Sequence, residues 1–244
     1  MVDHTQEIWA LSGDGHTIYA RCPKYFAAIL HVVLNGWSIS KADANSNAQL
    51  AVAFTNGGYS IDSVVLSQPE KYVEVIDGLN EFLVNLAYIV LRKYRNARLI
   101  HCAAYENKGE AHLIVAQKNQ GKSTLIYQKV CSGDQVLADD LLIWLPKTAE
   151  FVCLGLPLRM RRPVLGLDGQ AADPESFFAG NGIAYSKSGV FSIAPYGHRV
   201  LLDHIWQIKR DYVPVKIPIY KAAQTLNNFL IGPEFSEKRK DKVN

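Results

Sequence analysis

The residues best suited to chemistry in this sequence form a short stretch beginning at position 116. Residues 116–123 read Ala-Gln-Lys-Asn-Gln-Gly-Lys-Ser, which is the phosphate-binding pattern G-x-x-x-x-G-K-S/T with alanine in place of the first glycine. In such a loop the backbone N–H groups and the positive end of the following helix face the phosphates. The pattern predicts an ATP site that comprises Asn119, Gln120, Gly121, Lys122, Ser123 and Thr124.

Each conserved position of the pattern has its own task. Gly121 allows the backbone to approach the phosphates, Lys122 places its charge on the β- and γ-phosphates, and the Ser123 hydroxyl binds Mg²⁺. Ala116 is a departure, because an alanine forced to positive φ costs on the order of 1 kcal/mol relative to glycine. Asn119 reduces that concern, since asparagine enters the left-handed region readily. The alternative is a chance Gly-Lys-Ser-Thr at an ordinary helix start.

A pair of aspartates follows at a suggestive distance. Asp139 and Asp140 come after the apolar run Val136-Leu137-Ala138, and 139 − 122 places the first of them 17 residues after Lys122. That gap holds one helix, a turn and a strand, so the pair is expected at a strand end beside the phosphates. One carboxylate can bind Mg²⁺ there and the other can accept the proton of an attacking hydroxyl. The sequence does not say which aspartate has which role.

A basic cluster at positions 159, 161 and 162 is the other candidate for phosphate chemistry. An arginine such as Arg159 can neutralise charge on a phosphoryl group, but the same cluster is also compatible with a solvated surface. The loop-like stretches 168–174 and 180–182 are candidates for a mobile substrate lid. The seven histidines show no HxxxH spacing, so no structural zinc is expected.

Several elements must position these residues. A strand over 112–115, a helix over 121–130 and strands over 136–138 and 141–145 give the strand–loop–helix–strand order of nucleotide-binding α/β units. In the first half, the pattern predicts a helix from Pro23 to about Leu34. It also predicts a hairpin of residues 50–54 and 59–66, and an amphipathic helix from about Gly78 to Arg95. We expect a mixed α/β fold with a soft boundary near residue 96.

Composition narrows the class of protein. The chain has 244 residues with 26 basic and 23 acidic side chains, a net charge of only +3, which does not favour a nucleic-acid partner. No apolar window is long enough for a membrane span, and the N-terminus lacks the features of a signal peptide. The four cysteines are far apart, which argues against a disulfide framework. A cytoplasmic protein without a membrane partner is expected.

These motifs together resemble the HPr kinase/phosphorylase family, whose nucleotide site is similar to that of phosphoenolpyruvate carboxykinase. The resemblance rests on His101 in Leu99-Ile100-His101-Cys102, the strand at 113–115, residues 121–124, and Gly133 through Asp140. It covers residues 96–145 well, continues loosely through 156–159 and 201–206, and does not inform the first 90 residues. It implies the kinase fold of that family over 96–235. Separately from the resemblance, residues 1–95 are expected to form an N-terminal α/β lobe that helps select the acceptor, and residues 236–244 a charged tail.

The resemblance also implies chemistry. His101 is expected near the transferred phosphoryl group, beside catalytic Lys122, Asp139 and Asp140. Thr124 stands where the bifunctional HPr enzymes typically have glutamate, which favours a one-way kinase. Such an enzyme would move the γ-phosphoryl of ATP to a hydroxyl, with serine of a peptide or protein as the expected acceptor. Relatives assemble as hexamers, so a homo-oligomer is compatible with the resemblance. The alternatives are a nucleotide-binding regulatory or assembly protein without turnover, and a kinase for a small metabolite.

Overall fold

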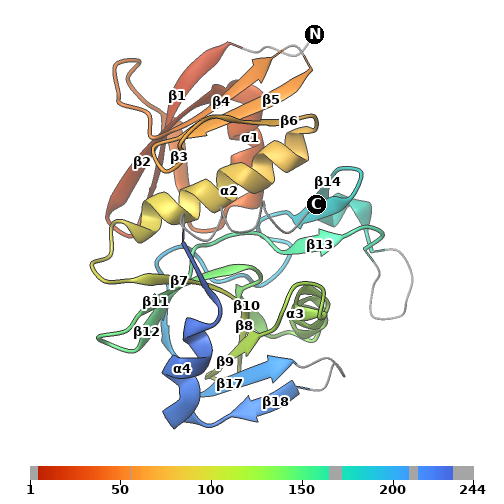
Figure 1. The fold of residues 1–244 in the computed structure, drawn as a ribbon. Coiled ribbons are helices and arrows are strands. Elements are labelled where there is room, and N and C mark those ends of the chain that lie inside the picture. Colours follow the sequence, from red (N-terminus) through yellow and green to blue (C-terminus); the bar gives the residue numbers. More distant parts are fainter. Residues whose placement is uncertain (1–4, 56, 165–171, 209–213, 233–244) are drawn as a thin grey trace, which may run out of the picture.

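The computed structural model describes residues 5–55, 57–164, 172–208 and 214–232. Strands dominate these residues, which form four sheets and four α-helices (Figure 1). The chain is therefore a mixed α/β protein, as the sequence predicted. The charged tail (236–244) and residues 168–171 of the candidate lid lie outside the described residues.

The N-terminal sheet has six strands in the order β3-β1-β2-β4-β5-β6. Its strands are β1 (Gln6–Gly13), β2 (His16–Pro23), β3 (Ser38–Lys41), β4 (Leu50–Thr55), β5 (Gly58–Ser63) and β6 (Glu70–Tyr72). The antiparallel pairing of β4 with β5 confirms the predicted hairpin. The second strand ends at Ser63 rather than at residue 66, because the Ser63 hydroxyl accepts a hydrogen bond from the backbone N–H of Val65 and turns the chain.

Two helices pack against this sheet. Helix α1 (Lys24–Val33) follows Pro23 and buries Phe26 and Leu30, close to the prediction. Helix α2 (Val75–Leu91) starts and ends earlier than predicted. Beyond Leu91 the helical pattern gives way to tighter turns, in which the N–H groups of Lys93 and Tyr94 donate to the carbonyls of Val90 and Leu91.

The second half of the chain forms the other three sheets. One has the order β10-β8-β9-β17-β18, with β8 (Ala103–Asn107), β9 (Glu110–Val115), β10 (Gln135–Ala138), β17 (His204–Ile208) and β18 (Pro214–Ile217). Another has the order β16-β12-β11-β7-β19, with β7 (Arg98–His101), β11 (Leu141–Leu145), β12 (Glu150–Val152), β16 (Arg199–Leu201) and β19 (Leu230–Ile231). The third, β13-β15-β14, comprises β13 (Arg159–Arg161), β14 (Phe177–Ala179) and β15 (Ile183–Ser186). The helices of this half are α3 (Lys122–Cys131), α4 (Ala222–Asn227) and the 3-10 turns η1 (Pro174–Ser176) and η2 (Ile219–Lys221).

Strand direction decides where the motifs meet. Strand β8 is antiparallel to both β9 and β10, so β9 and β10 run the same way. The loop that follows β9 and the aspartates that follow β10 therefore leave the same edge of the sheet. His101 and Cys102 lie at this edge too, because they precede β8, which runs in the opposite direction. The predicted strand–loop–helix–strand order is present as β9, α3, β10 and β11.

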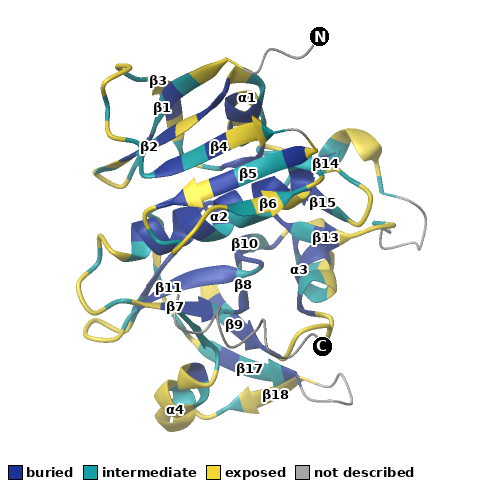
Figure 2. Ribbon diagram, turned by 45° about the horizontal axis from the view of Figure 1, so that its top comes forward, coloured by how far each residue is buried: buried dark blue, intermediate teal, exposed yellow. Residues whose placement is uncertain are grey.

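One apolar core joins the first half of the chain to the second. The cluster includes Phe82 and Leu86 of α2 together with Leu99 of β7 and Ile143 of β11. Helix α2 lies between the N-terminal sheet and the sheet that contains β7 and β11, and most of its residues are buried (Figure 2). The division near residue 96 stays a prediction. Among the described residues, no helix is both long and apolar enough to span a membrane.

Candidate functional site

The loop after β9 leads into the N-terminus of α3, where the described residues provide no side-chain cap. Gly121 is the N-cap residue of α3, with φ of 82°, and the first turn of the helix holds no acidic residue. A Cβ at Gly121 would meet nothing within 4 Å, so glycine is required there by backbone conformation rather than by space. The uncapped N–H groups and the helix dipole together form an anion-binding end.

The positive φ of this loop falls on Asn119 and Gly121, at 70° and 82°. Ala116 is buried and does not adopt positive φ. The strain that an alanine could cause at the first position of the pattern is therefore absent. Asn119 adopts the left-handed conformation instead, which asparagine enters more readily than most residues.

Lys122 is buried at the start of α3, and its ammonium group faces the loop. Its Nζ donates to the carbonyl of Ala116 at 2.9 Å and to that of Gln117 at 3.4 Å. Gln120 also closes the loop, since its side-chain oxygen accepts the N–H of Gln117 at 2.9 Å. The loop is thus curled around the lysine. Thr124, by contrast, is exposed on the first turn of the helix.

The two aspartates lie where the chain crosses from one sheet to another. Residues 139 and 140 link β10 to β11, and beside them Cys102 links β7, which ends at His101, to β8. The N–H of Cys102 donates to the carbonyl of Asp140 at 3.1 Å, and Leu141 pairs with His101. Two adjacent crossings therefore hold both aspartates and the histidine at the same edge as the loop.

Asp139 is only 5 % exposed. Its Oδ2 accepts the backbone N–H of Arg159 at 2.8 Å, whereas Oδ1 is buried without a hydrogen-bond partner among the described residues. Burial raises the pKa of this carboxyl to about 7, and the neighbouring Asp140 adds to the rise. The Arg159 N–H and the Ser123 hydroxyl oppose the rise in pKa, which places Ser123 next to the carboxyl.

Asp140 has the opposite character. Its side chain is 38 % exposed, and Oδ1 lies 2.9 Å from Nε2 of His101. Burial works to raise the pKa of Asp140, but the His101 contact and the charges of Arg159 and Lys122 outweigh it, so the pKa is lowered. The same charges show that Lys122 and Arg159 lie within electrostatic reach of this carboxylate. Two adjacent carboxyls therefore have separated pKa values.

The three arginines of the basic cluster have different surroundings. Arg159 and Arg161 are two residues apart in β13, so their side chains leave the same face of the strand. Arg161 donates to the side-chain oxygen of Asn119, whereas Arg162 donates to the carbonyl of Gly180 at 2.6 Å. Nε of Arg159 is buried and lacks a hydrogen-bond partner in the described part of the chain. The sequence placed all three arginines in one basic cluster and indicated Arg159 as the candidate for phosphate chemistry.

A scan against protein-family models and a search of curated proteins both found no match for this chain. The resemblance to the HPr kinase family therefore stays a prediction.

The residues present fit a magnesium ion. Mg²⁺ prefers oxygen ligands, commonly one or two carboxylates with waters and phosphate oxygens. Oδ1 of Asp139 is buried and has no hydrogen-bond partner among the described residues, and the Ser123 hydroxyl acts on the same carboxyl. A metal ion there would satisfy the buried oxygen and favour the ionised carboxylate.

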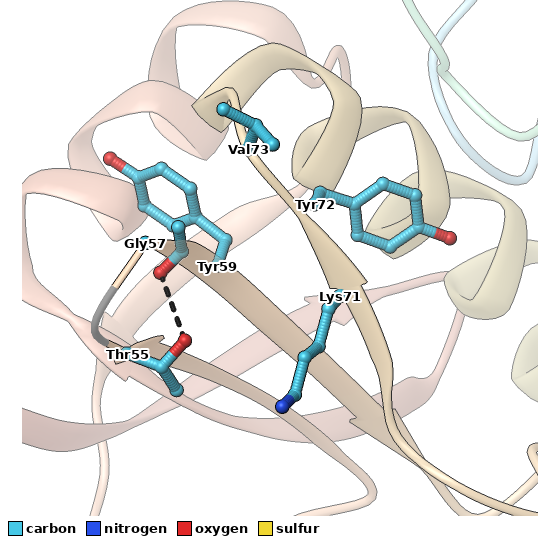
Figure 3. A pocket seen from close by; sticks show the side chains of 7 residues that line it. Thr55, Gly57, Tyr59, Lys71, Tyr72 and Val73 are labelled. Carbon is cyan, nitrogen blue, oxygen red and sulfur yellow. Dashed lines mark hydrogen bonds between the residues drawn. The ribbon is translucent and has the colours of Figure 1, made fainter.

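A hollow elsewhere on the molecule involves none of these residues. It has a volume of about 330 Å³ and lies on the N-terminal sheet, where the β4–β5 turn meets β6 (Figure 3). Its lining comprises Thr55, Gly57, Gly58, Tyr59, Lys71, Tyr72 and Val73. The sequence-predicted site lies in the other half of the chain.

Proposed function

We propose that this chain is an ATP-dependent kinase that transfers the γ-phosphoryl group to a hydroxyl, with a serine of a peptide or protein as acceptor. One observation supports the proposal above all. A bare helix end with a buried lysine, and two carboxyls with opposite pKa shifts, gather at one edge of one sheet. Phosphoryl transfer needs this combination of phosphate binding, metal binding and a hydroxyl-orienting acid.

The two aspartates differ in a way that suggests their roles. Asp139 has a buried oxygen without a hydrogen-bond partner in the described part of the chain, and the Ser123 hydroxyl acts on the same carboxyl, so we assign Asp139 and Ser123 to Mg²⁺. Asp140 is only partly buried and is held by His101, so we assign it to the acceptor hydroxyl. An Mg²⁺ ion held by Asp139 and Ser123 would supply positive charge that stabilises a transferring phosphoryl group.

The remaining residues serve the phosphates. Lys122 and the first N–H groups of α3 hold the phosphate oxygens. Nε of Arg159 has no hydrogen-bond partner among the described residues. The charge of Arg159 also acts to lower the pKa values of Asp139 and Asp140. Arg159 is therefore placed to neutralise a transferring phosphoryl group. His101 positions Asp140 and keeps it ionised.

A second candidate is a nucleotide-binding regulatory protein without turnover. It is favoured by the contacts of Lys122 with the carbonyls of Ala116 and Gln117 and by the contact of Arg161 with Asn119. A triphosphate must replace these contacts before it can occupy the loop. Loop opening could then be the regulated event.

Label transfer from γ-labelled ATP distinguishes the two. The wild-type protein is mixed with Mg²⁺, labelled ATP and a cell extract, and acid-stable label is followed on protein and on small molecules separately. Asp140→Asn should lower transfer by roughly 10²–10⁴-fold, the usual contribution of a proton-accepting group. Glu150→Gln, at the end of β11 and β12 opposite to Asp140, is the control and should retain transfer.

The other outcomes are equally informative. Magnesium-dependent ATP binding without transfer in any fraction supports the regulatory protein. Label on a small molecule alone supports a metabolite kinase. Transfer that survives Asp140→Asn unchanged would remove Asp140 from the reaction.

A further inference from the structure

A second group of potential ligands lies at the other end of β9. Glu110 begins β9 and His112 follows two residues later on the same face, while the parallel register places His204 of β17 directly beside His112. One ligand atom from each of these three side chains can be chosen so that all lie within 4.8 Å of one another. His112 is four residues before Ala116, which is about 13 Å along a strand, so this cluster is separate from the phosphate loop.

The surroundings hold the two imidazoles in place. The ring of Tyr105 stacks on His112 with centroids 4.7 Å apart and an angle of 4°. Trp206 donates its indole N–H to Nδ1 of His112 at a long 3.3 Å. His204 Nε2 lies 3.3 Å from Glu110 Oε2.

One polar atom of the cluster has nothing to bind. Nδ1 of His204 is buried and has no hydrogen-bond partner within the described ranges. A buried nitrogen without a partner is unfavourable, because it has lost its hydrogen bonds to water. The other charged groups near the cluster do not satisfy it. Asp203 accepts the N–H of Ala111 at 2.8 Å, and the ammonium of Lys129 lies over the Tyr105 ring at 4.8 Å.

We propose that Glu110, His112 and His204 bind one zinc ion, independently of the kinase site. Two imidazoles and one carboxylate form a common donor set for zinc, which needs ligands at about 2.0–2.2 Å. Small rotations of the three side chains close the present spacing to such distances, and Glu110 is exposed enough to move. Water completes the coordination.

The choice of ligand atom on His112 has a consequence. Nδ1 accepts the Trp206 N–H, so its lone pair is the one available on the neutral ring. Zinc takes that lone pair and displaces the long indole hydrogen bond. The fluorescence of Trp206 should therefore change on zinc binding.

The histidine spacing along the chain did not predict this site. His112 and His204 are 204 − 112 = 92 residues apart and meet only through the pairing of β9 with β17. Zinc would link these two strands, so its expected role is to stabilise this side of the sheet rather than to act on phosphate.

Isothermal titration of the full chain with Zn²⁺ alone tests the proposal. Wild type should bind one ion per chain, and His204→Ala should weaken binding by at least the roughly 10–100-fold that loss of even an outer partner costs. His31→Ala, a change at an exposed histidine on α1, is the matched control and should bind like wild type. Glu110→Gln should weaken zinc binding and should fold, because its side chain is 61 % exposed.

Two further readouts connect the ion to this place. Bound zinc should raise the thermal unfolding midpoint of wild type and leave that of Glu110→Gln less changed. It should also alter tryptophan fluorescence in wild type but not in Trp206→Phe. The proposal is overturned if wild type shows no saturable zinc binding, or if binding persists in His204→Ala and Glu110→Gln and is lost in Asp139→Asn.

Discussion

Asp139 and Asp140 are neighbours in sequence, yet their environments separate them. Asp139 is buried with one oxygen unbonded, whereas Asp140 reaches solvent and contacts His101. Nothing in the dipeptide itself distinguishes the two. Their difference comes from the positions of β13 and β7, which the sequence alone did not supply.

These environments predict opposite pH dependences of stability. The folded pKa of Asp139 is raised from 3.8 to about 7, so the folded state holds a proton that the unfolded state has lost between these values. The contribution of Asp139 to the free energy of unfolding therefore falls as pH rises from about 4 to 7. Asp139→Asn removes this penalty and should be more stable than wild type by about 1 kcal/mol or more at pH 8, with the gap closing near pH 4.

Asp140→Asn is the matched comparison. The pKa of Asp140 is lowered, so its stabilising contribution is present above the unfolded pKa and is lost as pH falls through the folded pKa. Asp140→Asn should be less stable than wild type at pH 7, with the difference shrinking in acid. Urea unfolding of both variants at several pH values measures this. If the stability of both variants relative to wild type changed in the same direction with pH, the opposite pKa shifts of Asp139 and Asp140 would be contradicted.

At the scale of elements, the phosphate loop depends on two left-handed residues. Gly121→Ala should cost about 1–2 kcal/mol of stability, entirely from backbone strain, because a Cβ there meets nothing within 4 Å. Ala116→Gly restores the usual pattern, but Ala116 has no positive φ. That change should therefore destabilise by about 0.5–1 kcal/mol. Urea unfolding of the two variants measures these changes in stability. A more stable Ala116→Gly protein would show that the loop is strained at that position.

The sequence pattern predicted the elements around the phosphate loop, because the strand, the loop, the helix and the two aspartates follow one another within a short span. It also predicted α1 and the β4–β5 hairpin. The β1–β2 hairpin was missed, although Asp14-Gly15 between two β-favouring runs is a strong hairpin signal. The contact between Arg161 and Asn119 joins residues 42 apart, and no short-range pattern reveals such a contact.

At the scale of the whole molecule, the first half of the chain is packed onto the second. Trp37 donates its indole N–H to the carbonyl of Leu154 at 2.9 Å and stacks on Tyr196 with centroids 4.1 Å apart. Phe82 of α2 lies in the core that also contains Ile143. These contacts predict that both halves unfold together.

Phe82→Ala tests this cooperativity. Loss of a fully buried phenylalanine should cost about 3–5 kcal/mol, and the transition should shift equally for both halves. Single-tryptophan variants that retain Trp37 or Trp144 provide one probe in each half. A lower midpoint for Trp37 with an unchanged midpoint for Trp144 would mean that the halves unfold independently.

Phosphate binding by Lys122 at the start of α3 is the property on which the proposed kinase activity depends most. Titration with a fluorescent ATP analogue and Mg²⁺ tests this directly in wild type, in Lys122→Ala and in Lys118→Ala, an exposed lysine of the same loop. Wild type and Lys118→Ala should show saturable, magnesium-dependent binding, and Lys122→Ala should bind roughly tenfold more weakly or worse, a loss of about 1.4 kcal/mol or more. Equal binding by Lys122→Ala, or no binding by wild type, would contradict the central claim.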